Sequence, residues 1–269
     1  MKLFKFLKPK KDQGYVVPIM GGLGGQILGY ALYEFLKKKH GTKAVADGSS
    51  LFSSSGYRLA GPGEDLNQHV WNLGYYGIRA DSDHGIRQNK GEWPQGFKIL
   101  HEGESERAKL YSEVIETISA DTFPVQKDHR DFIQSTFKNE KLLVVHVRQS
   151  DYLNVASKVI RAVDNVELIK KLSAFRPDKT IFVSDGPIDD VELATKTGAK
   201  VEVFHSTDYF LVHALLRRAD ILIVANSQFS LTAALLNPNS LAFFPKDYFG
   251  KGHDSLNKYY QHPFQYFFR

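Results

Sequence analysis

Short apolar segments alternate with helical segments through the second half of the chain. Runs such as Ile221–Val224 are continuously apolar, as expected of strands that are covered on both faces. Strands that alternate with helices predict a parallel sheet with right-handed crossovers. The predicted strands span Lys141–Val147, Thr180–Ser184, Lys200–Phe204, Asp220–Ala225 and Ser240–Phe244. The predicted helices span Asp164–Ala174, Pro187–Thr197, Tyr209–Arg218 and Ser227–Leu236.

The first half is less regular. It opens with a predicted strand at Tyr15–Val17, a glycine-rich turn and a helix at Ile27–Lys39. Residues 47–102 are rich in Gly, Ser, Asn and aromatic residues, which is typical of loops and short strands that contact substrates. The remaining predictions are a strand at Lys43–Ala46 and helices at Ser105–Ile118 and Phe123–Asn139.

The chain therefore reads as an α/β protein of two lobes. Its 269 residues are enough for two ordinary domains with ample core. We predict a basic tail over residues 1–12, an N-terminal domain over 13–138 and a C-terminal domain over 139–269. We expect the last helix to pack back on the N-terminal domain.

The net charge of +5 is located in the first eleven residues. Met1–Lys11 contains five lysines and no acidic residue, so the rest of the chain is neutral, which argues against a nucleic-acid-binding surface. For this tail a solvated terminus and peripheral contact with an anionic membrane surface both stay open. With no cysteine and no apolar run of membrane-spanning length, we expect a cytoplasmic protein without disulfides or thiolate chemistry.

A basic and acidic cluster, His146-Val147-Arg148-Gln149-Ser150-Asp151, comes at the end of the strand predicted at 141–147. Open α/β sheets bind ligands at this edge, and an arginine there can grip a diphosphate. His146 is predicted either to bind the ligand or to be a satisfied buried residue. Asp151 is predicted to orient Arg148 rather than to accept a proton, because a carboxylate beside an arginine is a poor base.

A glycine-rich turn, Gly21-Gly22-Leu23-Gly24-Gly25-Gln26, precedes the first predicted helix. Glycines let backbone N–H groups approach an anion, and the start of a helix favours negative charge. No Gly-Lys-Ser/Thr follows, and Tyr30 and Ala31 stand where a dinucleotide fold has its third glycine. A triphosphatase loop and a nicotinamide dehydrogenase are therefore disfavoured. A turn without a ligand is the alternative.

Two further strand ends carry polar residues. Asn226–Ser230 joins a strand to a helix, and its hydroxyls and amides can either cap the helix or hold a phosphate. Ser184 and Asp185 follow another strand and are predicted to contact a guanine or ribose, with capping of the next helix as the alternative for Asp185.

In this order the segments resemble the α-1,2-fucosyltransferase family, glycosyltransferase family 11. The family pattern Gly-Gly-Leu-Gly-Asn-Gln, His-x-Arg-Arg-x-Asp-Tyr and Asn-Ser-Ser-Phe-Ser is similar to residues 21–26, 146–152 and 226–230. Residues 182–185 are similar to its Phe-Ser-Asp segment, and the resemblance spans about residues 15–245. The chain departs from the pattern at Gly25, Gln149, Ser150 and Leu231-Thr232.

The resemblance implies a GT-B-like fold, in which two Rossmann-like domains face each other across a cleft and the C-terminal lobe holds the nucleotide sugar. It implies inverting, metal-independent transfer of L-fucose from GDP-fucose to the 2-hydroxyl of a terminal galactose or similar hexose in a glycan, with no cofactor. The catalytic candidates are His146, Arg148 and Asp151. The donor-binding candidates are Gly22, Gly24, Gly25, Gln26, Arg148, Ser184, Asp185, Asn226, Ser227, Phe229 and Ser230.

Other interpretations stay open. Gln149 in place of a second arginine is compatible with another nucleotide sugar, or with a non-catalytic nucleotide- or glycan-binding protein of the same fold. Asp81-Ser82-Asp83 has the form of a metal motif, but no apolar strand precedes it, so a solvated turn is favoured. Asp189-Asp190 is expected at a helix start. The general base is not distinguished among Asp47, Glu64 and Asp65.

Overall fold

The computed structural model describes residues 13–52, 70–81, 86–88, 92–93, 95–100, 110–111, 113–115, 118–149, 162–245 and 266–268. The strands are β1 (Gly14–Pro18), β2 (Ala44–Asp47), β3 (Ile86–Arg87), β4 (Phe97–Ile99), β5 (Leu142–Val147), β6 (Lys179–Ser184), β7 (Val201–Phe204), β8 (Ile221–Ile223), β9 (Leu241–Pro245) and β10 (Tyr266–Phe268). The α-helices are α1 (Leu23–His40), α2 (Ser49–Phe52), α4 (Lys127–Thr136), α5 (Val166–Leu172), α6 (Asp190–Thr197), α7 (Tyr209–Arg218) and α8 (Gln228–Leu235). Short 3₁₀ turns are η1 (Gly41–Lys43), η3 (Leu73–Tyr76), η5 (Ala162–Asn165) and η6 (Ser173–Phe175).

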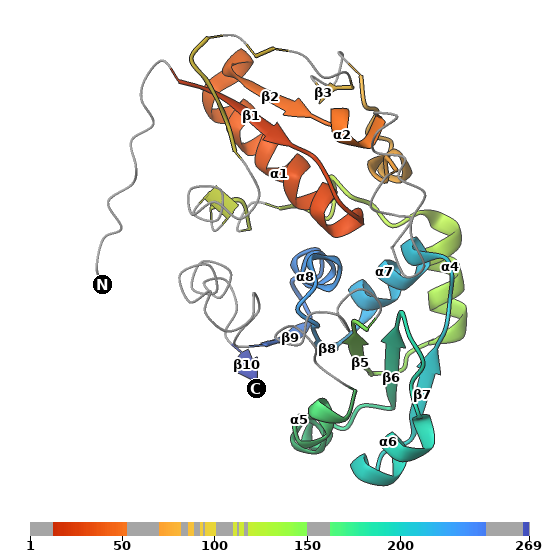
Figure 1. Ribbon diagram of the computed structural model, residues 1–269. Helices are drawn as coiled ribbons and strands as arrows, with labels where there is room; N and C mark the ends of the chain where they lie inside the picture. The colour runs from red at the N-terminus through yellow and green to blue at the C-terminus, as the bar shows by residue number, and fades with distance from the viewer. Residues whose placement is uncertain are drawn as a thin grey trace.

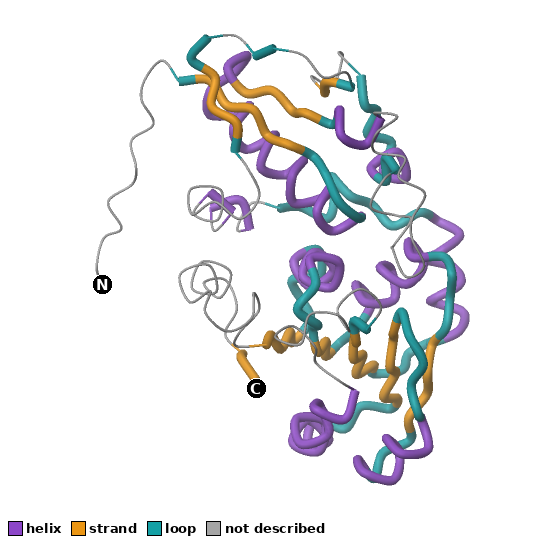
Figure 2. The backbone as a smooth tube through the Cα atoms, in the orientation of Figure 1, coloured by secondary structure: helices purple, strands orange, loops and turns teal. Residues whose placement is uncertain are grey.

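The strands form two parallel sheets, one in each lobe. The first has the order β3-β2-β1-β4 and the second has the order β10-β9-β8-β5-β6-β7. Helix α1 lies between the first sheet and the second lobe (Figure 1). Helices α7 and α8 cover the face of the second sheet that is turned toward the first, and α5 and α6 cover the opposite face (Figures 1 and 2).

Strand β5 shows why the second sheet is covered on both faces. All six of its residues are buried. Leu142 and Val144 pack with α7 and α8, whereas Leu143 and Val145 pack on the side of α5 and α6. This alternation follows from the two-residue period of a strand, and each such side chain contributes about 1.5–3 kcal/mol when fully buried.

One hydrophobic core runs through both lobes. The cluster that contains Leu222 of β8 and Leu231 of α8 continues into Leu28 of α1 and Val17 of β1. The two lobes are therefore joined by apolar packing and not only by the connecting chain.

This contact depends on Gly24. A Cβ atom at this position would overlap the backbone of Gln228 and Phe229 at the start of α8. At the neighbouring Gly25, a Cβ atom would lie 2.8 Å from the Met20 carbonyl oxygen. The absence of both side chains allows the first turn of α1 to rest on the backbone of α8.

The α/β class with two parallel, Rossmann-like sheets is confirmed. The strands predicted in the second half all form, and Tyr209–Arg218 is helical over the predicted range. Helix α1 begins at Leu23, four residues earlier than predicted, because its glycines lie inside the helix and pack against α8. The end of the chain differs as well, since Tyr266–Phe268 pairs with β9 as a strand where we expected a helix on the first lobe. Residues 105–109 of another predicted helix lie outside the described residues.

The first sheet lies entirely before residue 138 and the second entirely after it. The domain boundary at 138/139 stays a prediction, as does the basic tail, because residues 1–12 lie outside the described residues.

Gly24→Ala should destabilise the protein by about 1–3 kcal/mol. The overlap with the α8 backbone outweighs the gain in helix propensity, which is about 1 kcal/mol for alanine over glycine. Urea unfolding measures the difference. Gly22→Ala is the matched control, because no atom of the described residues lies within 4 Å of a Cβ there. An equal loss of unfolding free energy in Gly24→Ala and Gly22→Ala would contradict the packing role of Gly24.

Candidate functional site

Three segments that are far apart in the sequence meet at the start of α8. The first turn of α1 touches it, since Gly24 lies against the backbone of Gln228. The ring of His146, on β5, lies 5.7 Å from the ring of Phe229 between centroids. The glycine turn, the His-Arg segment and the Asn-Ser segment are thus brought together near the carboxyl ends of β5 and β8.

The start of α1 carries no side-chain cap. Gly22 is the N-cap and makes no side-chain hydrogen bond, and the first turn contains no acidic residue. The first N–H groups of a helix lack intrahelical partners and carry partial positive charge. Gly21 turns the chain at φ 74°, a conformation that glycine adopts without strain. These features suit the turn to an anion.

At the start of α8, some of the backbone N–H groups already have hydrogen-bond partners within the protein. The Ser227 hydroxyl accepts the N–H of Phe229 at 3.3 Å, so the capping alternative is observed for this residue. Ser230 is fully buried, and its hydroxyl lies 3.4 Å from the carbonyl oxygens of Ala225 and Ser227. Asn226 is also buried. Ser230 therefore points into the interior, although we predicted that it lines a phosphate.

Arg148 is held by Asp185. The guanidinium Nε lies 3.2 Å from Asp185 Oδ2, and Asp185 Oδ1 accepts the backbone N–H of Gln149 at 2.6 Å. One carboxylate at the end of β6 thus fixes both the arginine and the backbone that follows β5. The cap of α6 is instead Asp189, which accepts the N–H of Glu192 at 2.8 Å. Capping, the alternative for Asp185, is therefore wrong, and the expected place of Asp189 at a helix start is confirmed.

His146 is buried and uncharged at neutral pH. Burial lowers its pKa to about 4; the Asp185 carboxylate opposes this effect and the Arg148 cation adds to it. Its Nδ1 atom is buried and receives no hydrogen bond from the described residues. A buried polar group without a partner costs about 1–3 kcal/mol. Ligand binding and a buried structural role both stay predictions for His146. A ligand at this edge could supply the missing partner.

Gln26 has a structural role. Its amide Nε2 donates to the carbonyls of Gly21 at 2.7 Å and Val70 at 2.8 Å, and its Oε1 accepts the N–H of Asn72 at 2.8 Å. Both amide hydrogens are used, and the side chain is fully buried. Gln26 therefore fixes the glycine turn against residues 70–72 and has no hydrogen left to donate to a ligand.

Ser184 is the strand partner of Val147 and so lies beside the His-Arg segment. Ser184 accepts the N–H of Gly186 at 3.1 Å and so shapes the turn after β6. Asp47 accepts the N–H of Ser49 at 3.0 Å. The residues outside the described ranges are Asp151, Glu64, Asp65, Ser82 and Asp83.

Within the described residues, no group of three or more His, Asp or Glu side chains is arranged to hold a metal ion. Metal independence stays a prediction. Over the same part of the chain, no helix is long and apolar enough to cross a membrane.

Sequence reasoning missed His213 of α7. Its ring packs edge-on against Phe229 at 5.1 Å, and its Nε2 lies 3.1 Å from the Thr232 hydroxyl. The only signal was a histidine on the apolar face of the helix, and that pattern does not name its partners.

No protein-family model matches the sequence, and no curated protein matches it. Several solved structures are similar. POFUT1 in complex with GDP aligns over 87% of this chain and 99% of its own, with 11% sequence identity and a TM-score of 0.46. POFUT1 in complex with GDP-fucose aligns over 88% and 98%, with 9% identity and a TM-score of 0.44. Fucosyltransferase NodZ from Bradyrhizobium aligns over 85% and 94%, with 12% identity and a TM-score of 0.43.

The low pKa of His146 predicts that stability rises with pH between about 4 and 6.5. In this window the unfolded histidine takes up a proton that the folded one does not, so acid favours unfolding. Burial also lowers the pKa of His213, so this residue too makes stability rise with pH. Urea unfolding at several pH values should show a smaller slope for His146→Asn, by up to about 1.4 kcal/mol per pH unit. The exposed His205→Asn serves as the control. Identical slopes in wild type and His146→Asn would contradict this prediction.

Proposed function

We propose that this chain is a glycosyltransferase that moves L-fucose from GDP-fucose to a hydroxyl of a glycan acceptor. We further propose that the transfer is inverting and needs no metal, and that the acceptor group is the 2-hydroxyl of a terminal galactose or similar hexose. The acceptor and the linkage rest on the resemblance of residues 21–26, 146–152 and 226–230 to the α-1,2-fucosyltransferases.

The observation that carries the proposal is the convergence of three segments on the start of α8. The uncapped start of α1 lies against it through Gly24, and His146 packs on Phe229. Arg148 follows His146 by two residues and is oriented by Asp185. Backbone N–H groups, a guanidinium and a neutral imidazole are a set of groups that suits a diphosphate.

The chemistry requires that the charge of the departing nucleoside diphosphate be offset. In this proposal Arg148 supplies the positive charge, and the starts of α1 and α8 supply backbone donors. His146, uncharged at neutral pH, forms a hydrogen bond to the donor and does not act as a cation. Asp185 acts on Arg148 as a positioning residue. The orienting role of Asp151, which lies outside the described residues, stays a prediction.

A second candidate is transfer from another nucleotide sugar. Gln149 stands where the fucosyltransferase pattern has a second arginine, and its side chain lies against Gly186, 2.5 Å from where a Cβ atom would stand. Because glutamine replaces an arginine here, the site has one positive charge fewer, and it could prefer a nucleotide sugar other than GDP-fucose. Calorimetric titration with GDP, UDP, GDP-fucose and other nucleotide sugars separates the candidates. Binding of UDP sugars with no binding of GDP would remove GDP-fucose as the donor.

Arg148→Ala should lower GDP affinity by about 10- to 100-fold, because a charge-assisted hydrogen bond contributes about 1.5–3 kcal/mol. Fucose transfer should fall by at least about a hundredfold, since the arginine acts on charge that develops as the sugar departs. Calorimetry and release of GDP in the presence of acceptor measure the two effects. The exposed Arg130→Ala is the control. An Arg148→Ala enzyme with full turnover would remove this residue from the mechanism.

A turnover assay also tests whether the chain is an enzyme at all. GDP binding without release of GDP from GDP-fucose over a panel of galactose-terminated acceptors would favour the non-catalytic alternative.

A further inference from the structure

Residues 72–76, in and next to η3 of the first lobe, lie along α7 of the second lobe. The Tyr209 hydroxyl donates to Asn72 Oδ1 at 2.5 Å. The ring of Tyr75 stacks on Phe210, with centroids 4.0 Å apart and planes within 6°. Near the end of α7, Arg217 donates to the Phe123 carbonyl at 2.6 Å, and the ring of Tyr76 packs edge-on against Phe123 at 5.3 Å. These contacts involve residues at the start and near the end of α7, so the helix is fixed at both ends.

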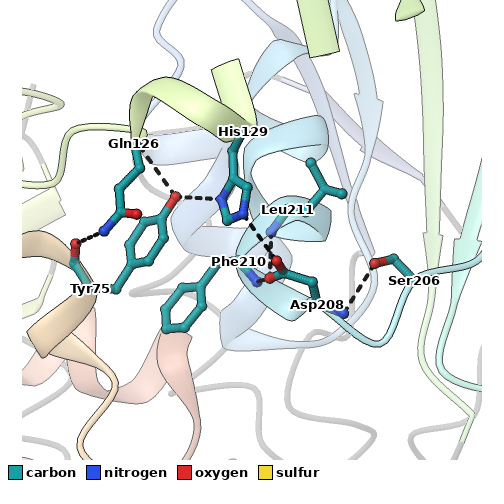
Figure 3. A network of polar contacts seen from close by, with 7 residues as sticks. All are labelled: Tyr75, Gln126, His129, Ser206, Asp208, Phe210 and Leu211. Atoms are coloured by element: carbon teal, nitrogen blue, oxygen red, sulfur yellow. Dashed lines mark hydrogen bonds and ion pairs between the residues drawn. The ribbon is translucent and has the colours of Figure 1, made fainter. Parts of the chain in front are cut away.

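His129 of α4 adds a polar bridge to this contact (Figure 3). Its Nδ1 lies 2.6 Å from the Tyr75 hydroxyl, and its Nε2 lies 3.0 Å from Asp208 Oδ2. The other carboxylate oxygen of Asp208 caps α7 by accepting the N–H groups of Phe210 and Leu211 at 3.0 and 3.1 Å. The bridge thus joins the first lobe, the connecting helix and the start of α7.

The hydrogen positions follow from the partners. A carboxylate only accepts, so Nε2 of His129 carries a hydrogen and donates it to Asp208. Nδ1 of a neutral ring then accepts from the Tyr75 hydroxyl, whose oxygen in turn accepts the N–H of Gln126 at 3.3 Å. Burial raises the pKa of Tyr75, so its hydroxyl is a weaker acid than usual and keeps its proton. The geometry is therefore that of a structural bridge and not of a proton relay.

Helix α7 connects the contact between the lobes to the candidate site. His213, in the middle of α7, lies 3.1 Å from the Thr232 hydroxyl of α8 and packs against Phe229. Phe229 also contacts His146 and stands beside Gly24 of α1. A shift of α7 relative to the first lobe would therefore separate the starts of α1 and α8.

We propose that Tyr75, His129 and Asp208 are positioning residues that hold the two lobes so that the starts of α1 and α8 together receive the nucleoside diphosphate. This inference rests on the proposed function for the identity of the ligand. The bridge itself is a statement about lobe geometry and is testable without the ligand.

Asp208→Asn is the sharpest variant. Asparagine caps a helix about as well as aspartate, so α7 keeps its cap while the bond to the His129 N–H is weakened. Asp189→Asn makes the same chemical change at the cap of α6, away from the lobe contact, and is the matched control. Because His129 and Asp208 form a partly exposed pair, we expect the two variants to have similar unfolding free energies.

Asp208→Asn should lower GDP affinity by about three- to tenfold relative to Asp189→Asn. The donor KM should rise by a similar factor, with kcat changed less than about twofold. Tyr75→Phe keeps the stack on Phe210 and should have the same effect. The double variant with Tyr75→Phe and Asp208→Asn should bind GDP no more weakly than either single variant, because both substitutions interrupt the same bridge. GDP affinity in Asp208→Asn equal to that in Asp189→Asn would overturn the proposal.

Hydrogen exchange distinguishes failure of this inference from failure of the proposed function. The first-turn amides of α1 and α8 should exchange faster in Asp208→Asn than in Asp189→Asn, whether or not GDP is present. If wild type binds no GDP but this difference is seen, the bridge stands and the donor assignment falls. Unchanged exchange in Asp208→Asn would overturn the bridge even if GDP binds.

Discussion

The contact between Gly24 and the backbone of α8 is the constraint on which the lobe arrangement and the candidate site both depend. It places the starts of two helices side by side, and each start carries a partial positive charge of about half a unit. Because the two helix starts are in contact, their partial positive charges repel each other. The arrangement therefore raises the electrostatic free energy of the protein when no anion is bound. A bound anion would offset that cost, which gives the helix packing a physical reason to coincide with a phosphate site. Arg148, only 14% exposed and turned toward Asp185, adds to the same positive region.

The second half of the fold could be predicted because its strands are apolar on both faces and its helices are separated by regular intervals. The pattern of β5, buried over its whole length, and the exact range of α7 required no knowledge of tertiary contacts. The start of α1 could not be predicted in the same way. Glycine is a poor helix former, and only the nearness of α8 explains why Gly24 and Gly25 belong to the helix. Strand β10 was missed because its pairing partner β9 supplies the reason for its extended form.

The segments predicted to form the site come together in the structure, but the hydrogen bonds of several of their residues were not foreseen. Arg148 and His146 were predicted to lie at a strand end, and they do. Asp185 was placed at a neighbouring strand end, yet its two hydrogen-bond partners are set by the pairing of β5 with β6. Gln26 was part of a recognisable motif, but its bonds to Val70 and Asn72 depend on a segment more than forty residues away. Partners at such separations leave no local pattern in the chain.

The core that continues from Val17 to Leu231 bears on how the molecule can be divided. Many two-lobed proteins can be cut at the linker into fragments that each fold. Here a separated half would present the apolar surfaces of α1, or of α7 and α8, to water. We therefore expect the two lobes to fold and unfold as one cooperative unit.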